Sequence, residues 1–72
     1  MAETMNENET VEETRIFVRH AMLINERLVH EFGIANFEFL LYGPFKLDTL
    51  AMARNGWTLN EAESAIREVL AN

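Results

Sequence analysis

The longest periodic segment of the chain is residues 10–32, TVEETRIFVRHAMLINERLVHEF, which contains neither Gly nor Pro. At about 100° per residue, Val11, Val18, Met22 and Val29 fall nearly on one line of a helix. Further apolar side chains flank that line: Ala21, Leu28, Phe32, Phe17 and Ile24. The pattern predicts a helix about 34 Å long with a wide apolar stripe, too long for the rest of so short a chain to cover.

Short signals define the ends of this helix. Thr10 and Glu13 form a T-x-x-E capping box, in which each side chain bonds the other residue's backbone N–H. Glu12 and Glu13 lie where the helix dipole favours negative charge. Gly33 is placed to end the helix.

Chain length and composition favour self-association. A chain of 72 residues forms one domain at most, near the size at which a single core becomes marginal. It contains no Cys, so neither a disulfide nor a thiolate metal site can stabilise it, and 49% of its residues are apolar. We therefore expect a subunit interface or a bound partner.

The long helix offers one candidate interface between two copies. Asn25 occupies an a-type position of a pattern in which core residues recur three and four positions apart. In a coiled coil, Asn at such a position commonly fixes the register and favours an assembly of two helices. The equally weighted alternative places Asn25 at the edge of an ordinary core stripe. The homodimer interface predicted from this alternation consists of Val11, Val18, Ala21, Asn25, Leu28 and Phe32.

The formal charge of −6 is concentrated near the N-terminus. Five acids precede Arg15, the first base, and leave seven acids against six bases in the rest of the chain. Without a basic patch, we expect no direct DNA binding. Residues 1–9 are interpreted as a disordered acidic arm, and residues 10–72 as a single small helical domain. No targeting segment and no long apolar run is visible, so the expected location is cytoplasmic, with no membrane.

Three shorter helices are predicted after Gly33. Asn36 is a good N-cap for the apolar segment IANFEFLLYGPF, and Gly43-Pro44 would end that helix. Its aromatic residues cannot all be buried in so small a chain without a second molecule: Phe37, Phe39, Tyr42 and Phe45. The next helices are expected at 46–54 and 59–70, the latter opened by the capping box of Thr58 and Glu61. The predicted fold is all-α, with one long N-terminal helix packed on a cap of about three shorter helices.

The turn before the last helix has a local resemblance. Residues 56–67, GWTLNEAESAIR, resemble the G-F-x-x-x-E-A-x-x-A-L-R run of ubiquitin-associated-type helical modules, in which the Gly-aromatic turn is a protein-docking loop. The resemblance covers about a dozen of the 72 residues. It departs from the family at Asn55, where Met is usual, and after Leu70, where a third helix would follow.

The residues that commonly carry catalysis are scarce. The single Ser, Ser64, lies within a predicted helix, and His20 and His30 point about 80° apart on theirs. Glu26 and His30 share a helix face but supply only two of the ligands that a zinc site needs. We therefore expect no enzymatic activity, no metal and no cofactor.

The predicted function is protein binding, by an adaptor, inhibitor or regulator of the kind that phages and mobile elements encode. The candidate binding residues are Ile16, Arg19, Leu23 and Arg27 on the outer face of the long helix, with Tyr42 and Trp57. Three alternatives stay open. An oligomer could bind a small anionic ligand between subunits through Arg19, His20, Arg27 or Arg54, or the acidic arm could mimic nucleic acid. A DNA-bound regulator built on the helix pair of residues 47–70 is disfavoured by its exposed glutamates.

Overall fold

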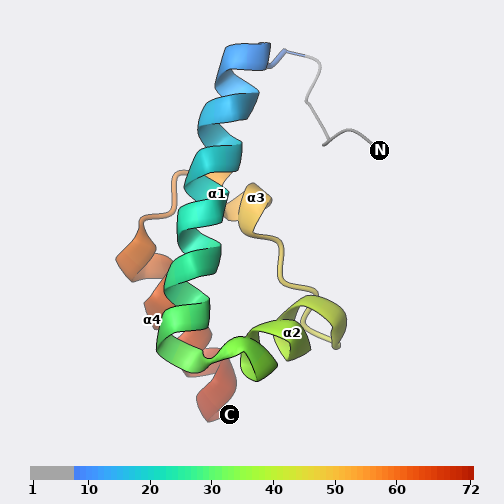
Figure 1. Cartoon of the computed structure of the whole chain (residues 1–72), viewed down its shortest axis with the longest axis vertical. Helices are drawn as coiled ribbons and strands as arrows, with labels where there is room; N and C mark the ends of the chain where they lie inside the picture. Colours follow the sequence, from blue (N-terminus) through green and yellow to red (C-terminus); the bar gives the residue numbers. More distant parts are fainter. Residues whose placement is uncertain (1–7) are drawn as a thin grey trace.

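The computed structural model describes residues 8–72, which form four helices and no strand. The helices are α1 (Val11–Phe32), α2 (Ile34–Tyr42), α3 (Thr49–Arg54) and α4 (Leu59–Ala71). α1 runs along the molecule, α3 and α4 pack against it, and α2 turns away from its C-terminal end (Figure 1). The predicted all-α architecture, with one long helix against shorter ones, is confirmed.

The two longest helices begin where the sequence predicts. The Glu13 backbone N–H donates to Thr10 Oγ1 at 3.0 Å, and the Thr10 N–H donates to Glu13 Oε1 at 2.9 Å. Thr58 and Glu61 repeat this reciprocal pair at the start of α4, at 3.0 and 2.9 Å. Both boxes satisfy backbone donors that a helix start leaves without intrahelical partners.

Gly33 joins α1 directly to α2. Its φ of 90° and ψ of 156° belong to a region that only glycine adopts readily, and its N–H donates to the Val29 carbonyl at 2.8 Å. α2 therefore starts at Ile34, and the prediction of Asn36 as its N-cap was wrong. Asn36 instead lies inside the first turn, where its side-chain Nδ2 donates to the Phe32 carbonyl at 2.7 Å.

α3 is shorter than the predicted helix over residues 46–54. Lys46 has a φ of 58°, outside the right-handed helical region, and the Leu47 N–H donates back to the Leu40 carbonyl at 2.8 Å. Asp48 acts as the N-cap, accepting the Ala51 N–H at 3.0 Å, so it is not a residue of the first turn. The segment between α2 and α3 is thus held against α2 and does not extend α3.

The core lies on one flank of the predicted stripe of α1. Its buried members are Ile24, Leu28, Phe37, Leu40, Leu47, Ala62 and Ile66. Leu28 and Ile24 lie about 110° and 150° around the helix from the line through Val11 and Met22, and these last two side chains stay exposed. The flank is buried because α3 and α4 both pack there. Of the predicted central line, Val18 and Val29 are half-buried, and only Val11 and Met22 are exposed.

Candidate protein-binding surface

The outer face of α1 brings together three of the six predicted binding residues. Ile16, Arg19 and Leu23 follow i, i+3, i+7 spacing and point away from the buried flank that holds Leu28. All three side chains are exposed. Together with Arg15, which lies one turn before Arg19, they form what we call the outer face.

The arginines of the chain fall into two groups. Arg27, Arg54 and Arg67 each bind a carboxylate of the same chain. Arg15 and Arg19 form neither an ion pair nor a hydrogen bond with any side chain in residues 8–72. Two like charges one helical turn apart destabilise a helix by about 0.2–0.5 kcal/mol. The outer face therefore carries two cations that form no ion pair within the described chain.

Arg27, also predicted to bind a partner, belongs to the contact between α1 and α4. Its Nη1 donates to Asn60 Oδ1 and to Glu63 Oε1, both at 3.0 Å. Glu63 also accepts from Arg67, whose guanidinium lies 5.2 Å above the ring centre of Phe32. The Arg27 hydrogen bond, followed by that of Arg67, lowers the pKa of the Glu63 carboxyl below its ordinary value.

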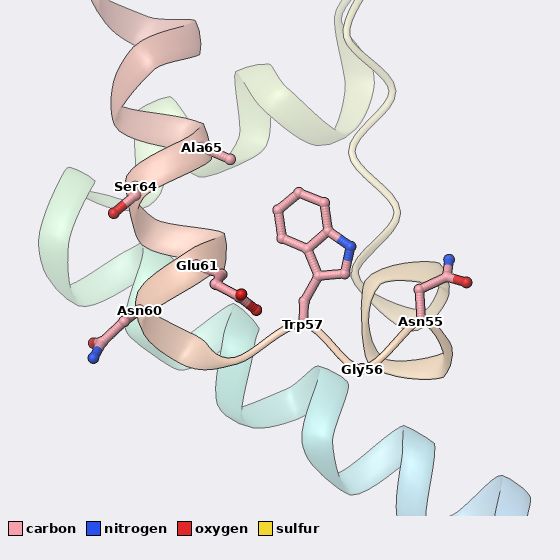
Figure 2. Close-up of a pocket in the computed structure, with 7 residues that line it drawn as sticks. All are labelled: Asn55, Gly56, Trp57, Asn60, Glu61, Ser64 and Ala65. Atoms are coloured by element: carbon pink, nitrogen blue, oxygen red, sulfur yellow. The ribbon is translucent and has the colours of Figure 1, made fainter.

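Trp57 lies in the turn between α3 and α4 and partly covers the core. Its ring packs against the core cluster, and Figure 2 shows the indole beside α4, above the turn formed by Asn55 and Gly56. The backbone N–H of Trp57 donates to the Met52 carbonyl at 3.0 Å. His20 Nε2 lies 2.6 Å from the Trp57 carbonyl, and because that oxygen only accepts, Nε2 carries the hydrogen. The Gly-aromatic turn is therefore fixed to both α1 and α3.

A shallow groove of about 660 Å³ opens beside the indole (Figure 2). Its lining combines a mainly apolar surface with several polar side chains and contains no cation: Asn55, Gly56, Trp57, Asn60, Glu61, Ser64 and Ala65. Glu61 Oε1 accepts the Thr58 backbone N–H at 2.9 Å as part of the capping box of α4. The groove thus offers hydrogen-bonding groups around one aromatic ring.

α2 presents a second apolar surface that the sequence identified only in part. Tyr42 is exposed as a binding residue requires, and Ile34, Phe39 and Phe45 are exposed with it. We call these four residues the α2 surface. Of the four aromatic residues in this segment, only Phe37 enters the core. Helical spacing alone does not distinguish the inward residue, because α2 is apolar on nearly every side.

The predicted homodimer interface on α1 overlaps the core of the single chain. Ala21 and Leu28 are buried by the chain's own helices, and Asn25 Oδ1 accepts the Thr49 hydroxyl at 2.7 Å. Phe32 is half-buried beneath Arg67. Val18 is half-buried, and Val11 is exposed. A dimer through this set of residues stays a prediction, although most of them already have contacts within one copy.

The remaining candidates concern ligands and the arm. Residues 8–72 contain no cluster of three or more potential metal ligands, and Glu26 and His30 lie exposed on α1. Residues 1–7 of the predicted acidic arm lie outside the described residues. Glu9, assigned to that arm from sequence, pairs with Arg54 at 3.1 Å and so belongs to the folded body. His20, Arg27 and Arg54, candidates for an anion site, are likewise engaged within the chain.

No family model, curated protein or solved structure matches this chain. Among the helices of residues 8–72, none combines the length and the apolar character needed to cross a membrane.

Proposed function

We propose that this protein is a non-enzymatic protein-binding module that acts as an adaptor, inhibitor or regulator by occupying a partner's surface with the outer face of α1. The observation that carries the proposal is the combination on this face of two exposed aliphatic side chains, Ile16 and Leu23, with two arginines, Arg15 and Arg19, that form no ion pair within residues 8–72. Neither pair has a role in the described fold, whereas the other arginines do.

The chemistry of the face indicates the kind of partner. Aliphatic side chains one heptad apart suit an apolar groove or a second amphipathic helix. Guanidinium groups form paired hydrogen bonds to carboxylates, so acidic side chains are expected at the rim of that groove. Because the opposite side of α1 is anchored by the core, the outer face is rigid before binding, which lowers the entropy cost of association.

Selection from a displayed library of random peptides tests the proposal, whatever the identity of the natural partner. Peptides selected on the wild-type protein should combine apolar with acidic residues. The variant Ile16→Ser/Leu23→Ser should weaken the binding of the selected peptides by about tenfold or more, and Arg15→Glu/Arg19→Glu should weaken it most at low salt.

Ile34→Ser is the matched control, because Ile34 is exposed to a similar degree but lies on α2, away from the outer face of α1. Its affinity for the same peptides should equal that of the wild type. Selected peptides that respond equally to Ile34→Ser and Leu23→Ser, or that carry no acidic residues, would contradict the proposal. Circular dichroism of each variant checks that helix content is retained.

A further inference from the structure

The α2 surface is the most apolar exposed region of the described chain. Ile34, Phe39, Tyr42 and Phe45 are 58%, 58%, 78% and 44% exposed. They lie on one short helix and the loop that follows it, at the end of the molecule where α2 leaves α1 (Figure 1). Such a concentration of large apolar side chains needs a covering partner more than scattered exposed residues do.

The size of the surface matches half of a small interface. At about 200 Å² for each large side chain, those exposed fractions correspond to about 480 Å² per copy. A patch of this area is as large as the largest apolar patch of a typical monomer, about 300–600 Å². Two copies would bury roughly twice that area from these residues alone, close to the ~1,000 Å² that a specific interface requires. Ala35 and Pro44, both exposed, would add to it.

The charges of the same segment are self-complementary. Glu38 on α2 and Lys46 in the following loop are exposed, and neither forms an ion pair with another residue in 8–72. Lys46 has the only positive φ outside glycine in the described chain, 58°, a backbone conformation that is costly for a side chain of its kind. One acid and one base beside an apolar patch can pair twice across a two-fold axis.

We propose that the α2 surface binds a second copy of this chain and forms a two-fold symmetric homodimer. Glu38 and Lys46 each lie four positions from Tyr42, and Phe39 and Phe45 each lie three positions from it. A two-fold axis through the α2 surface would pair Glu38 of each copy with Lys46 of the other. This interface is separate from the α1 residues predicted from the sequence and leaves the outer face free in both copies.

The distribution of charge along the molecule also favours a dimer interface at the α2 end. The described acids Glu9, Glu12 and Glu13 lie at the opposite end of α1, and the molecule is 37 Å long (Figure 1). Two copies joined through α2 keep these acids apart by more than a Debye length, about 8–10 Å. The repulsion between two acidic N-terminal regions therefore does not oppose this dimer.

The test is the mass in solution, measured by sedimentation across a dilution series of the full chain. The wild type should be a dimer that dissociates on dilution. Tyr42→Ser should raise the dissociation constant about 100-fold, because each copy loses an aromatic anchor and the change occurs twice. Ile16→Ser, on the outer face, is the matched control and should leave the dimer unchanged.

Charge reversal makes the test independent of any loss of folding. Glu38→Lys and Lys46→Glu should each weaken the dimer by placing like charges together, and the double variant should restore it. A wild-type monomer at millimolar concentration would overturn the proposal, and so would a dimer insensitive to Tyr42→Ser. A dimer that is lost instead with Met22→Glu would assign self-association to α1, and single reversals that are not rescued by the double variant would refute the proposed register.

Discussion

Arg54 of α3 holds the carboxylate of Glu9, the residue before the N-cap of α1. Its Nη2 and Nε both lie 3.1 Å from Glu9 Oε1, and Nε lies 3.4 Å from Oε2. The two side chains are 17% and 5% exposed, so the pair is largely removed from water. It connects residues 45 positions apart and fixes the start of α1 to the end of α3.

We predict that Glu9→Gln lowers the free energy of unfolding by about 1–3 kcal/mol, because a mostly buried guanidinium loses its charged acceptor. Urea denaturation followed by circular dichroism measures the change. Glu68→Gln, at an exposed position of α4, is the control and should stay within about 0.5 kcal/mol of the wild type. Equal effects of the two substitutions would show that the pair contributes no net stability.

The Glu63 carboxylate predicts how stability depends on pH. Its folded-state pKa lies below the ordinary value of 4.5 because Arg27 and then Arg67 donate to it. A carboxyl whose pKa is lowered by folding stabilises the folded state above its unfolded pKa, and this contribution is lost as the pH falls through the folded pKa. The Tm difference between wild type and Glu63→Gln should therefore be largest at neutral pH and shrink below pH 4.5. A difference that stays constant through this range would contradict the assigned cause.

Local signals in the sequence were sufficient for the starts of α1 and α4, whereas the other features depended on the conformation of Gly33 and on tertiary contacts. The capping boxes at Thr10 and Thr58 act over three residues, so they could be predicted correctly. The pairing of Glu9 with Arg54 depends on how α3 packs against α1, which no local pattern encodes. The choice of Ile34 over Asn36 as the start of α2 followed from the backbone freedom of Gly33.

In the candidate site, too, some residues could be predicted from local sequence and others only from tertiary contacts. Ile16, Arg19 and Leu23 were identified from helical spacing, since their exposure requires only that α1 buries another side. Arg27 sits at the border of that face, and its contacts with α4 became visible only in the folded chain. The α2 surface was predicted only as an excess of aromatic residues, because an all-apolar helix does not reveal which side packs inward.

Substitution of two isoleucines of α1, one buried and one exposed, tests which side of this helix packs into the core. Ile24 is fully buried, whereas Ile16 is 56% exposed. Ile24→Ala should lower the free energy of unfolding by about 2–5 kcal/mol, because it removes core contacts and leaves a cavity. Ile16→Ala should change it by less than about 1 kcal/mol, since much of that side chain already contacts water. Chemical denaturation of both variants measures the contrast, and comparable losses would mean that the assigned orientation of α1 is wrong.

The hydrogen bond between Thr49 and Asn25 provides a test of the two interpretations of Asn25, a position in a seam between two copies of α1 or a role within the single chain. The Thr49 hydroxyl donates to Asn25 Oδ1 at 2.7 Å, and Thr49 is buried. If Asn25 serves the single chain, Asn25→Leu should cost about 1–3 kcal/mol by leaving that hydroxyl without an acceptor. Asn25→Leu/Thr49→Val should recover much of the loss, because both polar partners are then gone. Sedimentation of Asn25→Leu supplies the second readout: an unchanged mass agrees with an intrachain role, whereas a shift to higher oligomers would place Asn25 in a seam between copies of α1.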